Sequence, residues 1–138
     1  MGRIILGAIV GFIFWSIVWL GSERILSAIW PEWYGAHQAA FEAAVNSGGA
    51  FTADTTILLM NIVRGSIISV LSGSLAAAIA RENWLTSIIL SGLLVAFGLF
   101  VEFMSWSLIP LWYHVIFTAL LIPMTILGGR RIRSASIA

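Results

Sequence analysis

The chain has 138 residues, of which 60% are hydrophobic and only 9% are charged, and its formal net charge is +1. A soluble domain carries about 25% charged residues, so this composition excludes an ordinary water-exposed surface and predicts a single membrane domain over residues 1–138. The small net charge creates no field that would attract nucleic acid. The chain has no cysteine, which excludes disulfides, thiol nucleophiles and cysteine-bound metals.

Four apolar segments are each long enough to form a transmembrane helix, which needs about 20 residues. The first covers about residues 3–22 and stays compatible with a helix as far as residue 29, before Pro31. The others are predicted at residues 55–80, 84–106 and 109–127, with a tail at 128–138. Because the last two connections are short, the sequence predicts an all-α integral membrane protein, an antiparallel bundle of four transmembrane helices.

The long connection between spans one and two, residues 30–54, is predicted to contain a short helix lying on the membrane surface. Residues 34–45 (YGAHQAAFEAAV) are rich in helix formers, and Gly48 and Gly49 follow as a stop signal. Asp54 directly precedes span two, where its side chain is expected to cap the first turn.

The arginines predict the orientation of the bundle. Arg3, Arg81 and the basic residues after residue 129 flank the spans on one side, whereas residues 21–54 carry four acidic residues, Glu23, Glu32, Glu42 and Asp54, against Arg24. The positive-inside rule then predicts a multi-pass protein of the bacterial inner (plasma) membrane, with both termini in the cytoplasm and residues 30–54 outside.

Span two carries small residues at every fourth position: Gly65, Ser69, Gly73 and Ala77. Small residues let helices approach closely in lipid, so this stripe predicts either packing within the bundle or the face of a homodimer or larger membrane complex. Span four has few small residues and Pro123 in its middle, so we expect it to be kinked or peripheral.

Span two also contains Arg64, a permanently charged residue that costs about 2.5–3.5 kcal/mol at a helix centre. Arg64 lies about 14 Å below the outer end of its span, whereas Glu102 of span three and His114 of span four lie about 6–8 Å below theirs. An arginine side chain that reaches outward covers most of this difference, and Asn61 lies one turn from Arg64. The sequence therefore predicts that Arg64 turns inward and pairs with Glu102 in an outward-facing polar pocket. The candidate binding residues are Arg64, Glu102, His114, Asn61, Trp106 and Trp112.

The tryptophans allow two interpretations. Trp106 and Trp112 fit a belt at the membrane interface or a wall for a ligand, and Trp15 and Trp19, four residues apart on span one, could flank the pocket or face lipid. The Arg64 cluster itself fits a structural clamp, or a binding site for an anionic head group, a small solute or a proton.

No nucleophile with its base, phosphate loop, dinucleotide fingerprint or zinc motif is present, so no enzyme activity, cofactor or metal is expected. Two hypotheses of function remain. The first is a small non-enzymatic membrane protein, an accessory or a lipid- or partner-binding module. The second is a small-solute or proton-coupled transporter or channel, acting as a homodimer.

Overall fold

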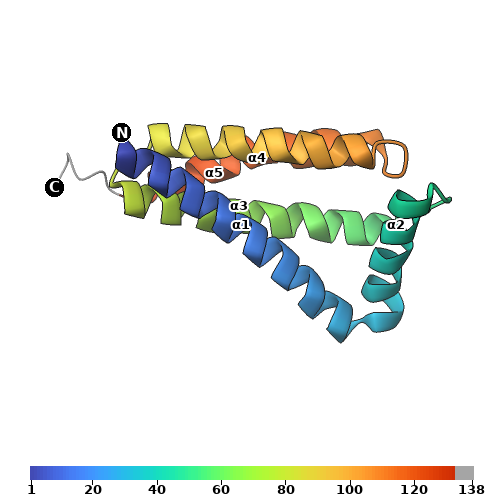
Figure 1. The fold of residues 1–138 in the computed structure, drawn as a ribbon. Helices are drawn as coiled ribbons and strands as arrows, with labels where there is room; N and C mark the ends of the chain where they lie inside the picture. Colours follow the sequence, from blue (N-terminus) through green and yellow to red (C-terminus); the bar gives the residue numbers. More distant parts are fainter. Residues whose placement is uncertain (133–138) are drawn as a thin grey trace.

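The computed structural model describes residues 1–132, and Arg133 and the rest of the predicted tail lie outside the described residues. The chain folds into helices joined by short connections (Figure 1): α1 (Gly2–Ile29), the π-helical turn η1 (Pro31–Gly35), α2 (Ala36–Ser47), α3 (Thr55–Ala80), α4 (Leu85–Met104) and α5 (Leu111–Arg130). Four of them, α1, α3, α4 and α5, are long and apolar enough to cross a membrane. The predicted all-α bundle of four transmembrane helices is confirmed.

The helix boundaries agree best for α3, whose bounds match the predicted span. The first helix takes the longer of its predicted courses and continues through Ile29. The last begins two residues later than predicted and runs on to Arg130, which brings Gly128 and Gly129 into the helix.

The expectation that the last helix is peripheral is wrong. A Cβ added at Gly128 would collide with the Val70 carbonyl oxygen, and one added at Gly73 would collide with that of Thr125, so α3 and α5 pack backbone against backbone. Pro123 lies inside α5, which is one helix from end to end.

Short connections supply local signals that begin or end three of the helices. Asp54 Oδ1 accepts hydrogen bonds from the amides of Thr56 (2.9 Å) and Ile57 (3.3 Å), which confirms its predicted role at the start of α3. Helix α2 ends at Gly48, which adopts the left-handed φ of 70° that glycine permits. The Glu82 carboxylate serves α4 in the same way as Asp54 serves α3, accepting from the amides of Trp84, Leu85 and Thr86.

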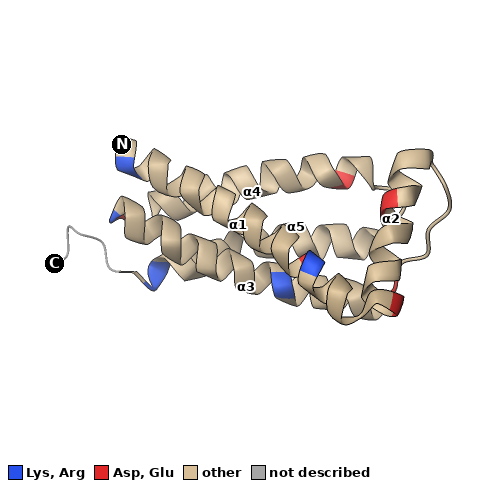
Figure 2. Cartoon of the chain, turned by 60° about the horizontal axis from the view of Figure 1, so that its bottom comes forward, with Lys and Arg blue, Asp and Glu red and all other residues tan. Residues whose placement is uncertain are grey.

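The bundle is closed at one end and splayed at the other. Near the N-terminus α1 lies against α3: the Arg3 guanidinium donates to the Ile79 carbonyl (3.2 Å), and a Cβ at Gly7 would lie 2.5 Å from the Ala76 oxygen. Toward its far end α1 diverges from α4, and α2 crosses the opening (Figure 1). Arginines mark the closed end and also occur on α1 and α3 nearer α2, and the acidic residues visible in this view lie toward the α2 end (Figure 2). The acidic Glu82, at the start of α4, lies at the closed end.

The small-residue stripe of α3 is used inside the chain. Ser69 and Ala77 are fully buried, and Ser69 Oγ accepts a hydrogen bond from the indole Nε1 of Trp15 on α1 (3.0 Å). A Cβ at Gly65 would lie 2.7 Å from the Phe117 ring of α5. The stripe therefore holds α1 and α5 against α3, and a dimer would have to use a different surface.

Candidate functional site

Arg64 points toward α1 and η1, where it is surrounded by acceptors. Its guanidinium lies 3.7 Å from the centre of the Trp19 ring and 3.5 Å from Glu23 Oε1, with 11% of the arginine side chain and 17% of the glutamate side chain exposed. It donates four hydrogen bonds of 2.6–3.0 Å, to the Trp19 carbonyl, Ser22 Oγ, the Tyr34 hydroxyl and Asn61 Oδ1. The arginine thus fastens three elements, α1, η1 and α3, to one another.

The predicted pairing of Arg64 with Glu102 is wrong, because Glu102 has partners on α5. Its Oε1 accepts a hydrogen bond from Thr118 (2.7 Å) and lies 3.7 Å from Nδ1 of His114. His114 is 2% exposed, and its ring stacks on Trp106 with the ring centres 4.8 Å apart. The predicted single cluster is in fact two: Arg64 with Glu23, and Glu102 with His114.

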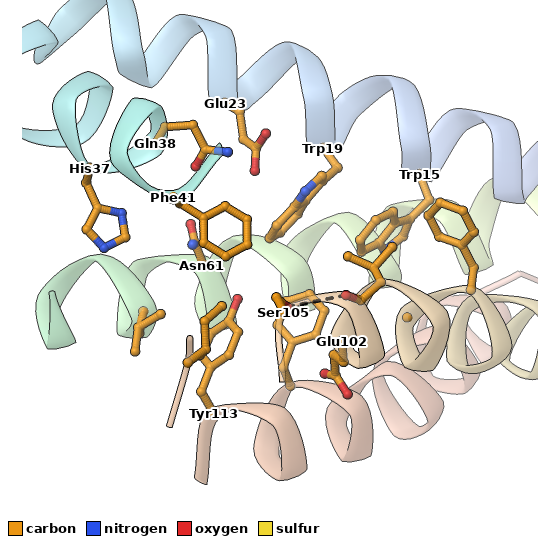
Figure 3. A pocket seen from close by; sticks show the side chains of 16 residues that line it. Trp15, Trp19, Glu23, His37, Gln38, Phe41, Asn61, Glu102, Ser105 and Tyr113 are labelled. Carbon is orange, nitrogen blue, oxygen red and sulfur yellow. Dashed lines mark hydrogen bonds between the residues drawn. The ribbon is translucent and has the colours of Figure 1, made fainter. Parts of the chain in front are cut away.

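Between the two clusters lies a cavity of about 170 Å³, where α1 diverges from α4. Six aromatic side chains and several aliphatic ones line it, together with a smaller set of polar groups (Figure 3). Glu23 points into it beside Trp19, and Glu102 lies at the opposite wall (Figure 3). The aromatic lining residues are Trp15, Trp19, Phe41, Phe97, Tyr113 and Phe117, and the polar ones are Glu23, His37, Gln38, Asn61, Glu102 and Ser105.

The six predicted site residues take different places around this cavity. Asn61 and Glu102 line it. Arg64 lies behind Trp19, and His114 lies behind Glu102. Trp106 covers His114 while staying 53% exposed, and Trp112 lies on the outside of the bundle, edge-on to Tyr113.

The sequence carried a signal for the cavity wall on α1. Trp15, Trp19 and Glu23 follow one another at intervals of four, so they lie on one face of a continuous helix. The two indole rings stack, with their centres 5.2 Å apart and an interplanar angle of 12°. The Tyr34 hydroxyl, in contrast, reaches Arg64 from the irregular turn η1, for which the sequence offers no comparable pattern.

His37 connects the cavity to the start of α3. Its Nε2 accepts a hydrogen bond from the Asp54 amide (3.1 Å), while Asp54 Oδ2 accepts one from the Trp33 indole (2.9 Å). An imidazole can accept at Nε2 only when that nitrogen is deprotonated. Burial lowers the pKa of His37 below its ordinary value of 6.5, and the nearby Asp54 carboxylate opposes this shift only in part.

This contact makes the connection between α2 and α3 sensitive to pH. The folded chain favours neutral His37, so its contribution is present above about pH 6.5 and is lost as the pH falls toward the folded pKa. We expect hydrogen exchange of the Asp54 amide, corrected for intrinsic rates, to speed up between about pH 7.5 and about pH 5.5. A His37→Gln variant, whose side-chain carbonyl can accept the bond without titrating, should lose that dependence; equal pH dependence in both proteins would contradict the assignment.

The cavity has the composition of a ligand-binding site. A mostly apolar cavity with polar groups at its walls resembles the general design of sites for small amphiphilic ligands. Over residues 1–132, no group of three or more His, Asp or Glu side chains lies close enough together to hold a metal ion. No protein family model, curated protein or solved structure matches the chain.

Proposed function

We propose that this chain is a non-enzymatic inner-membrane protein that binds a small amphiphile in the cavity between α1 and α4. The arginines at the closed end support the expected orientation, with both termini in the cytoplasm and the α2 end outside. In that orientation the cavity lies in the outer half of the membrane, where a ligand can enter from the outer leaflet or the adjoining water. The pocket lies beside Arg64 rather than around it.

The observation that carries this proposal is the contrast between the two halves of the bundle. The cavity is bounded by the splayed ends of the helices, whereas the closed end is packed through glycines: Gly7 against Ala76, Gly11 against Leu90, and Gly128 against Val70. Interiors packed in this way leave few voids as large as a water molecule. A site that is open on one side and closed on the other favours binding over passage.

The alternative, a small-solute or proton-coupled transporter, is favoured by the pair formed by Glu102 and His114, since ionisable residues at membrane depth often mark a pathway. The serines of α3 argue against a continuous route, because Ser66, Ser69 and Ser74 donate to carbonyls of their own helix and Ser69 is fully buried. This alternative is tested by measuring proton and solute flux into proteoliposomes. Absence of flux for the wild type under all gradients tested would exclude transport.

The binding proposal is tested by filling the cavity from one position. A Cβ at Gly98 would meet only Leu121, at 3.5 Å, and the position lines the cavity, so Gly98→Leu should place its side chain in the binding space. Gly92, on the same helix, has nothing within 4 Å of an added Cβ, which makes Gly92→Leu the matched control.

The probe is 4-phenyl-1-butanol, titrated into protein held in nanodiscs of zwitterionic lipid and followed by tryptophan fluorescence. Wild type and Gly92→Leu are expected to bind saturably with equal affinity. Gly98→Leu should bind about tenfold more weakly or not at all, a loss of about 1.4 kcal/mol or more. Equal titrations for all three proteins would overturn the proposal.

A further inference from the structure

The charges around the cavity do not balance, and this imbalance bears on what the cavity binds. Among residues 1–132, two largely buried carboxylates line the cavity, Glu23 and Glu102, and the buried guanidinium of Arg64 lies behind Trp19. Arg64 and Glu23 neutralise each other at 3.5 Å. The polar partners of Glu102 are the Thr118 hydroxyl and the His114 imidazole, neither of which carries a permanent positive charge.

Both contacts of Glu102 are made to the same oxygen. Thr118 donates to Oε1, and His114 Nδ1 approaches Oε1 as well, at 3.7 Å, which is beyond an ordinary hydrogen bond. The residues that line the cavity include no arginine or lysine, and Arg64, behind Trp19, is paired with Glu23. A carboxylate at membrane depth is costly unless it is paired. A positive charge in the cavity would therefore stabilise Glu102.

The rest of the lining is suited to carry that charge on an organic molecule. Six aromatic rings surround the space between the two glutamates (Figure 3), and aromatic rings attract cations, most strongly where water is excluded. An anionic head group, in contrast, would meet two carboxylates and would find Arg64 already engaged by five partners behind Trp19.

We infer that the ligand of the cavity is a small organic cation, an ammonium group carrying an aromatic or alkyl substituent, whose charge complements Glu102 and whose substituent packs on the aromatic wall. This inference rests on the proposed binding function and names its ligand class. The competing occupant is a proton on Glu102 or His114, which would balance the same charge without any ligand.

The test compares two probes of the same shape. Benzyltrimethylammonium carries one positive charge, and neopentylbenzene replaces its nitrogen with carbon. Both are titrated in zwitterionic nanodiscs against wild type and Glu102→Gln, with Gly98→Leu subtracted as the blank for partition into lipid. Glutamine can still accept the Thr118 hydrogen bond but has no charge, so the effect of the substitution on each probe isolates the Coulombic contribution.

Glu102→Gln is expected to weaken the binding of benzyltrimethylammonium about tenfold or more, because it removes one opposite charge at short range in a medium of low polarity. The affinity for neopentylbenzene should change by no more than about twofold. Equal effects of the substitution on both probes would overturn the inference that the ligand is a cation, while the proposal of amphiphile binding would stand. If neither probe binds to wild type more strongly than to Gly98→Leu, the proposed function is overturned instead.

A second comparison uses the wild type alone and remains available should Glu102→Gln fail to fold. Phenylmethanesulfonate presents the same ring with a negative charge. The cation is expected to bind about tenfold tighter or more than this anion. Equal affinities, or a preference for the anion, would contradict the inference.

Discussion

Replacing Arg64 with methionine is expected to lower the free energy of unfolding by about 3–5 kcal/mol, because removing one partner of a buried ion pair leaves the other charge unpaired. The charge left behind is that of Glu23, whose side chain is 17% exposed and points into a largely apolar cavity. Methionine fills a similar length with apolar atoms, so the loss reports the charge more than the packing. Equilibrium unfolding in mixed micelles of dodecyl maltoside and dodecyl sulfate measures it.

The double variant Glu23→Met, Arg64→Met separates the charge from the other contacts and should recover most of that loss. The neutral acceptors of Arg64 keep partners among themselves: the Tyr34 hydroxyl donates to Asn61 Oδ1 (3.1 Å), and Ser22 Oγ donates to the Trp19 carbonyl (2.9 Å). Without both charges, no unpaired ion is left in this network. A double variant as unstable as Arg64→Met would show that the hydrogen bonds, and not the ion pair, carry the energy.

Arg24 offers the matched control. It follows Glu23 on the same helix, but its side chain is exposed, and an exposed charge away from a network contributes within about 0.5 kcal/mol. Arg24→Met is therefore expected to unfold like the wild type. If Arg64→Met also unfolds like the wild type, the network joining α1, η1 and α3 does not stabilise the fold.

The four spans could be predicted from the sequence because lipid imposes a simple requirement. Backbone groups in the hydrocarbon core must pair within the segment, so long apolar segments must be helices. Asp54 and Gly48 could be predicted as well, since a cap and a left-handed turn are local features with few suitable residue types. All of these depend on the chain near each residue and not on how the helices turn toward one another.

The partner of Arg64 could not be predicted in the same way, because depth in the membrane does not determine direction around a helix. The depths estimated from the sequence put Glu102 within reach of the Arg64 side chain, but Glu102 lies on a helix that turns it toward Thr118 and His114. Glu23 was assigned to the connection after a span ending near residue 22, whereas α1 continues through Ile29 and keeps Glu23 in the helix with Trp15 and Trp19. Extending α1 would have placed all three on one face.

A boundary three residues too early also concealed the packing of the last helix. With span four ending at residue 127, Gly128 and Gly129 fell into the tail, and the remaining segment had too few small residues to suggest a close approach. In the structure both glycines belong to α5 and are buried, Gly128 against α3 and Gly129 against Ser87 of α4. Helix–helix contacts in lipid depend on such positions, so a small shift of a boundary changes which helix is predicted to be central.

That contact gives the second large effect: Gly128→Ala is expected to lower the free energy of unfolding by about 2–3 kcal/mol or more. Alanine favours the helix over glycine by about 1 kcal/mol, which would stabilise an unobstructed position. Here the added Cβ would collide with the backbone oxygen of Val70, and backbone cannot rotate away as a flexible side chain can. The helices must separate, and overpacking of this kind costs about 1–3 kcal/mol, occasionally more.

Gly92→Ala supplies the comparison, because it makes the same chemical change on α4 with nothing within 4 Å of the new Cβ. It is expected to leave stability unchanged or to raise it by up to about 1 kcal/mol. In the same mixed micelles, Gly128→Ala should therefore shift the unfolding transition toward lower stability, whereas Gly92→Ala should leave it unchanged or shift it toward higher stability. If Gly128→Ala matched Gly92→Ala, α3 and α5 would have room between them, and the closed end that argues for binding over passage would not be closed.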